Sequence, residues 1–66
     1  MLRNDIGEDA GKIWNLIKDN GKMSTSAVMN ALQMPERKLL MAIGWLARED
    51  KLKFHVKGKQ IFIELQ

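Results

Sequence analysis

The chain has no cysteine, one proline and one histidine among its 66 residues. Without cysteine it forms no disulfide and no thiolate metal site. A single histidine builds a metal site only together with several converging carboxylates, so we expect neither a metal nor a cofactor. A domain this small therefore depends on regular packing or on a second copy of the chain for its stability.

Long apolar runs are absent too. No run approaches the ~20 residues that a membrane-spanning helix needs. The opening "MLRNDIGEDAG" carries acids and lacks an apolar segment, so it is not expected to be a signal peptide. These features predict a cytoplasmic location without a membrane partner. The net charge of +3 is compatible with nucleic acid and does not require it.

Catalytic chemistry has little support in the sequence. His55 lies on the lysine-rich side of a predicted strand, with no serine close in sequence to act as a nucleophile. Glu8 and Asp9 are neighbours on a predicted helix, so their side chains diverge by about 100°, and the helix dipole explains acids in a first turn. There is no glycine-rich phosphate loop and no evident small-molecule site. We predict a protein that is not an enzyme, with no catalytic residues.

The first segment has apolar residues at helical spacing. The stripe consists of Ile6, Ala10, Ile13, Trp14 and Ile17. Asp5 is the expected N-cap, and Asn20-Gly21 is the expected stop. The other face of this helix is assigned to Glu8, Asp9, Lys12, Asn15, Lys18 and Asp19.

A second, short helix follows the bridge "KMS", which is itself a candidate for a minimal strand. Ser24 stands at the N-cap position of about nine helical residues. Val28, Ala31 and Leu32 are the inward candidates. Met34-Pro35 then breaks the helix, because proline disfavours helical geometry in the residue before it.

A third helix is predicted over about residues 35 to 49. Its core stripe consists of Leu39, Ala42, Ile43 and Leu46. Met34 and Leu39 have the spacing of a hydrophobic staple around an N-cap at Pro35. Two helices joined by so tight a turn form a helix-turn-helix.

The period then changes from 3.6 to 2. "KLKFHVK" and "QIFIEL" alternate apolar and polar residues on either side of "GK". Leu52, Phe54 and Val56 alternate with lysines and His55 in the first run, and Ile61, Ile63 and Leu65 continue the pattern in the second. Two alternating runs around a glycine turn predict a β-hairpin.

The order α-(β)-α-α-β-β predicts an α+β single domain over residues 1–66, and it resembles the winged helix-turn-helix fold along essentially the whole chain. More narrowly, "AGKIWNLI" and "ALQMPERKLLMAIGWLARED" are similar to a family of small, uncharacterised bacterial winged-helix proteins. The Ile13-Trp14 pair and "GWLARE" carry that similarity. The resemblance implies double-stranded DNA as a partner and a transcription-related role.

In winged-helix proteins the hairpin is the wing, which commonly lies along the DNA backbone. Lysines there would contact phosphates, although lysine on a strand edge also prevents aggregation. Arg37, early in the third helix, is the best candidate for a base-edge contact. The full set of DNA-binding candidates is Ser24, Thr25, Ser26, Arg37, Lys38, Lys53, Lys57 and Lys59.

The middle of the third helix favours a different partner. Together with Arg37, four residues outside the core stripe share one face and are candidates for a homodimer or protein interface: Met41, Gly44, Trp45 and Arg48. Glycine inside a helix costs about 1 kcal/mol against alanine, which suggests that something approaches Gly44 closely. Trp45 either belongs to this interface or folds back into the core. Association through this face, without DNA binding, is the alternative function.

Overall fold

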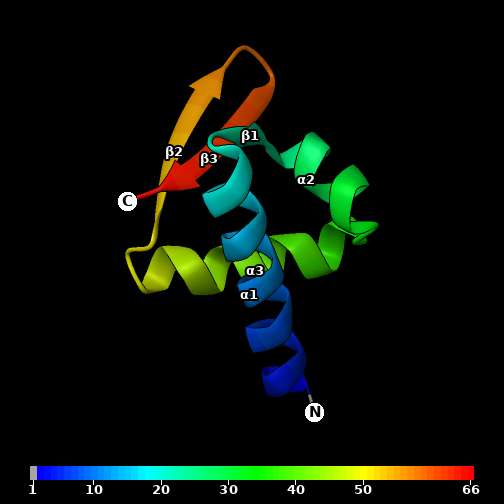
Figure 1. The fold of residues 1–66 in the computed structure, drawn as a ribbon. Coiled ribbons are helices and arrows are strands. Elements are labelled where there is room, and N and C mark those ends of the chain that lie inside the picture. The colour runs from blue at the N-terminus through cyan, green and yellow to red at the C-terminus, as the bar shows by residue number, and fades with distance from the viewer. Residues whose placement is uncertain (1) are drawn as a thin grey trace.

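The computed structural model of the chain describes residues 2–66, with side chains from Ile6 onward. Three helices and three strands follow one another in the predicted order (Figure 1). The elements are α1 (Leu2–Asn20), β1 (Met23–Ser24), α2 (Thr25–Leu32), α3 (Glu36–Arg48), β2 (Leu52–Lys57) and β3 (Gln60–Leu65). The structure is therefore α+β, and the prediction of a winged helix-turn-helix architecture is confirmed.

The start of the first helix was predicted wrongly. α1 begins at Leu2, so Asp5 lies inside the helix and is not its N-cap. Apolar spacing marks only the part of a helix that faces the core, and the described core residues of α1 begin at Ala10. The N-terminal end of α1 projects past α3 (Figure 1). The predicted stop is confirmed: the helix ends at Asn20, and Gly21 takes a φ of +80°, a conformation that glycine adopts without strain.

The tight connection between the second and third helices also follows local chemistry. Ser24 caps α2, as predicted: its Oγ accepts a hydrogen bond from the Ala27 N–H at 3.1 Å. Pro35 is the N-cap of α3, with extended backbone. Met34 and Leu39 are both buried in the same core cluster, at the predicted staple positions.

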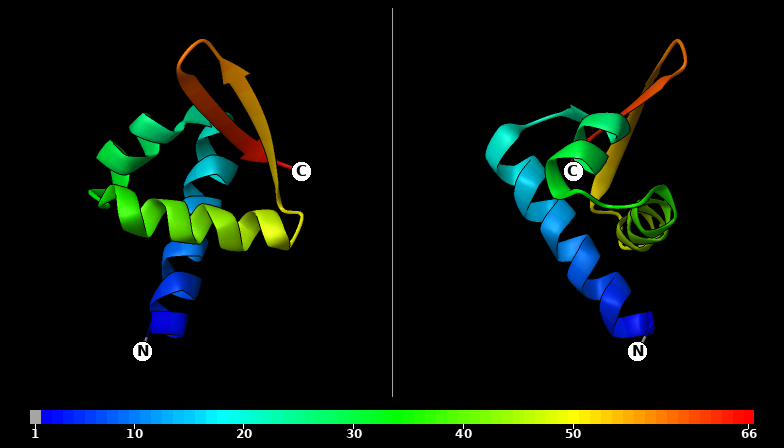
Figure 2. Two further views of the ribbon diagram at one scale, coloured as in Figure 1. Left: turned by 180° about the vertical axis from the view of Figure 1, so that it is seen from behind. Right: turned by 90° about the vertical axis from the view of Figure 1, so that its right-hand side faces the viewer.

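The sheet has three antiparallel strands in the order β1-β3-β2. β3 is the central strand, and the two-residue β1 and the hairpin partner β2 lie on its two sides. The hairpin turn falls at Gly58, whose φ is +62°. This hairpin is the wing, and its turn end extends beyond the helices in every view (Figures 1 and 2).

The core lies where α1 crosses α3 beneath the base of the sheet (Figure 2). All four predicted stripe residues of α3 are buried. Ile63 of β3 is fully buried and brings the central strand into contact with the helices. The buried hydrophobic residues are Ala10, Ile13, Ile17, Val28, Met34, Leu39, Ala42, Ile43, Leu46, Leu52 and Ile63.

Two residues differ from their predicted faces. Asp9 is buried, with 7% of its surface exposed, although we assigned it to the polar face of the first helix. It is buried because α3 crosses α1 here, and Lys38 of α3 reaches its carboxylate at 3.8 Å. Ala31, predicted to point inward, is exposed, and the last turn of α2 packs through Leu32 instead.

The apolar face of the wing is buried only at its base. Register pairs Leu52 with Leu65, Phe54 with Ile63 and Val56 with Ile61, so these side chains share one side of the hairpin. Leu52 and Ile63 are buried, whereas Phe54, Val56 and Ile61 are 45%, 74% and 43% exposed. The helices thus cover the base of the wing and leave the apolar side chains nearer the turn in solvent.

Candidate nucleic-acid interface

A hollow of about 290 Å³ separates the wing from the helix-turn-helix. It is bounded by the start of α2, the first turns of α3 and the wing turn. The lining residues are Ser24, Thr25, Ser26, Met29, Glu36, Leu39, Leu40, Lys59, Gln60 and Ile61. Four of the eight DNA-binding candidates therefore meet around one depression.

The three hydroxyl residues at the start of α2 differ in availability. The Ser24 hydroxyl is engaged as the helix cap. Thr25 is half-buried, and Ser26 is exposed. Of the three, Ser26 is thus the freest to meet a phosphate, together with the N–H groups of the first turn of α2.

α3 presents Arg37, Gly44 and Arg48 to solvent on one side. These residues are seven and four positions apart, so they lie within one narrow stripe of the helix. Glu36 is the single acid of α3, and it lies about 100° round the helix from Arg37. The outward face of α3 is therefore cationic at both ends.

Lys38 lies apart from that face. Its Nζ is 3.8 Å from the Asp9 carboxylate, which ties α3 to α1. The Lys38 side chain is half exposed, so this ion pair contributes little to stability. A phosphate contact by Lys38 would have to compete with Asp9.

The wing lysines divide between two surfaces. Lys53 and Lys57 share the side of the hairpin that carries His55, opposite the apolar side. The His55 Nε2 lies 3.2 Å from the Oε1 of Glu64, a diagonal neighbour that the register places opposite Lys53. Lys59 stands at the turn and lines the hollow. Lysines therefore lie on the polar side and at the tip of the wing.

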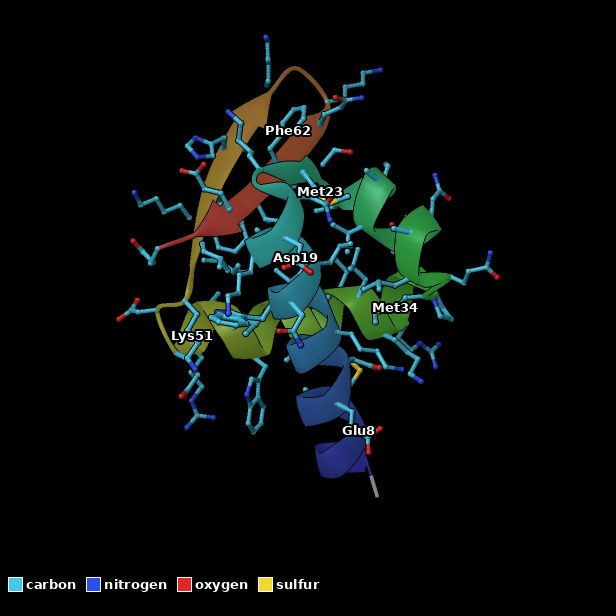
Figure 3. All side chains as sticks on the ribbon, viewed as in Figure 1. Glu8, Asp19, Met23, Met34, Lys51 and Phe62 are labelled. Atoms are coloured by element: carbon cyan, nitrogen blue, oxygen red, sulfur yellow. The ribbon has the colours of Figure 1, made fainter. Side chains whose placement is uncertain are left out.

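The four candidates for a homodimer or protein interface on α3 differ in exposure. Met41 and Trp45 are half-buried, whereas Gly44 and Arg48 are exposed. Trp45 packs against the core and lines a second hollow of about 330 Å³ with Trp14, Gly7 and Gly11 of α1. Lys51 also lines this second hollow. It follows the C-terminal end of α3, whereas Met34 lies at the N-terminal end of the same helix (Figure 3).

Sequence reasoning missed the exposed apolar residues. Leu40 is 58% exposed and lines the first hollow opposite Ile61. The sequence does carry a signal: Leu40 lies about 100° round the helix from Leu39 and outside the stripe of Leu39, Ala42, Ile43 and Leu46. Within residues 6–66 no cluster of three or more potential metal ligands occurs. Among the helices described, none has the length and hydropathy of a membrane span.

Comparisons with known proteins agree with this architecture. The family described as "Winged helix-turn-helix domain (DUF2582)" matches residues 1–65. An uncharacterized protein of the archaeon Methanocaldococcus jannaschii is 41% identical over 64 residues, which span 92% of this chain and 90% of that protein. Because this relative is archaeal, the predicted restriction of the family to bacteria is not confirmed.

Proposed function

The chain belongs to the winged helix-turn-helix family DUF2582, and from this membership we propose that it is a non-enzymatic, cytoplasmic protein that binds double-stranded DNA in a transcription-related role. The observation that carries the proposal is the outward face of α3, where exposed Arg37 and Arg48 flank a bare helix backbone at Gly44. Arginine is the side chain that most often reads guanine in the major groove.

Each part of the interface has a separate task in this proposal. Arg37 reaches a base edge, as residues early in a recognition helix do. Gly44 lets the helix approach the groove closely, because no side chain stands there. Ser26 and the first turn of α2 bind one phosphate, and Lys57 and Lys59 on the wing bind the backbone on the other side of the groove.

Electrostatics supports the same orientation. The chain carries eleven basic and eight acidic residues. Arg37, Arg48, Lys57 and Lys59 are all exposed. Phosphate contacts of this kind supply affinity without sequence recognition and make binding depend on salt.

The test is a titration of labelled random-sequence duplex DNA, followed by fluorescence anisotropy at several salt concentrations. Lys57→Ala with Lys59→Ala should reduce the slope of log K against log salt by about 2, since each phosphate contact contributes roughly 0.9. Arg37→Ala, measured on duplexes of defined sequence, should reduce the discrimination between duplexes that differ at one base pair. Lys12→Ala, an exposed lysine of α1, is the matched control and should leave the slope unchanged.

Two outcomes would contradict the proposal. One is the absence of binding at low salt. The other is a slope that the wing variant and the Lys12 variant change equally for each charge removed, because the charge would then act through the whole protein and not through the wing.

A further inference from the structure

The exposed large hydrophobic side chains of the described chain gather in one region. They are Leu40, Phe54, Val56 and Ile61. The last three share the apolar side of the wing, and Leu40 and Ile61 line the same hollow. Monomeric proteins rarely expose a contiguous apolar surface with a polar rim unless it binds something. We call these four residues the wing patch.

The hollow beside the wing patch carries one charge of each sign. Glu36 lines it from the first turn of α3, and Lys59 lines it from the wing turn. Among the side chains described from Ile6 onward, the ion pairs within 4 Å are Lys38–Asp9 and His55–Glu64, so Glu36 and Lys59 do not pair with each other. Both are exposed and available to a partner.

This arrangement is self-complementary. In a twofold dimer, any contact between two different residues across the interface occurs two times. Glu36 of the first copy would face Lys59 of the second, and Lys59 of the first would face Glu36 of the second. A polyanion such as DNA would be attracted by Lys59 and repelled by Glu36. An apolar patch between one acid and one base is therefore better matched by a second copy than by nucleic acid.

The way in which two copies would meet is also restricted. β2 is an edge strand and carries Lys53 and Lys57, which discourage edge-to-edge pairing. Face-to-face packing avoids this obstacle, because both lysines are on the opposite side of the hairpin from Val56. Val56 is the most exposed of the four and is the natural side chain to enter the partner's hollow.

We propose that the wing patch is a twofold self-association surface, in which the apolar side of each wing packs over the α3 hollow of a second copy and Glu36 pairs with the second copy's Lys59. This surface differs from the α3 stripe of Met41 and Trp45, both of which are half-buried in the single chain. Lys59 would pair either with Glu36 of the second copy or with a DNA phosphate, so the two contacts are alternatives at this side chain, and dimerisation is measured in the absence of DNA.

The experiment is sedimentation equilibrium of the full chain over a range of concentrations. Wild type should dimerise. Glu36→Lys and Lys59→Glu should each weaken dimerisation at least tenfold, since each places like charges opposite one another. An equimolar mixture of the two variants should recover association to within about threefold of wild type. In the mixed dimer the two introduced charges, which have opposite signs, face each other, and so do the unchanged Lys59 of one chain and the unchanged Glu36 of the other. Circular dichroism verifies that each variant is folded.

Two further variants complete the test. Lys57→Glu makes the same charge change on the opposite side of the wing and should leave dimerisation unchanged. Val56→Thr keeps the shape of an exposed side chain and should weaken dimerisation without unfolding the chain. The proposal is overturned by a wild type that stays monomeric at millimolar concentration, by a mixture that associates no better than its components, or by a Lys57→Glu variant as weak as Lys59→Glu.

Discussion

The Ser24 cap offers a direct test of how this fold is stabilised at its tightest connection. Ser24 ends β1 and caps α2, and its Oγ accepts the Ala27 N–H at 3.1 Å in a partly buried setting. The position of Ala27 is the one where a glutamate would bond back to the cap, so no reciprocal bond supports it. We expect Ser24→Ala to lower the free energy of unfolding by about 1 kcal/mol.

In a domain of this size, 1 kcal/mol lowers Tm by roughly 4–8 °C. The assay is thermal and urea unfolding followed by circular dichroism, with an unchanged urea m value. Ser24→Asp retains a capping oxygen and should recover most of the loss. Ser26→Ala is the matched control: Ser26 is exposed in the first turn of α2, so its effect should stay within about 0.5 kcal/mol. Equal losses at Ser24 and Ser26 would refute the cap argument.

Two stability predictions follow from how open or buried a position is. Gly44→Ala should raise the free energy of unfolding by up to about 1 kcal/mol, because a Cβ there meets no atom within 4 Å and alanine is the better helix former. Urea unfolding that shows a loss would mean that the site is less open than the structure indicates. Ile63→Ala should cost about 2–5 kcal/mol, since Ile63 is fully buried. Ile61→Ala, in the same strand but 43% exposed, should cost much less at concentrations where the chain is monomeric, and similar losses would contradict the assignment of the core to one end of the wing.

Local chemistry was sufficient to predict the element order. The Ser24 cap, the break at Met34-Pro35 and the buried stripe of α3 depend on neighbours in sequence, and all were predicted correctly. The alternation in the hairpin likewise gave the correct shared side for Phe54, Val56 and Ile61.

Features that depend on how the helices cross could not be predicted in this way. Asp9 is buried because α3 crosses α1 at that point, and periodicity along α1 contains no information about where a second helix lies. Trp45 was left between core and interface for the same reason, and the position of α1 places it half-buried. Alternation in the wing showed which residues share the apolar side of the hairpin, but it did not show which of those residues the helices cover.

The position of β3 in the sheet has a consequence for biosynthesis. Both β1 and β2 hydrogen-bond only to β3, and β3 is the last of the six elements along the chain. No strand pairing of this sheet exists until Gln60–Leu65 has left the ribosome, and the core lacks Ile63 until then. α1 and α3 can pack against each other before that point, but the part of their apolar surface that contacts β3 stays exposed until this last strand is available.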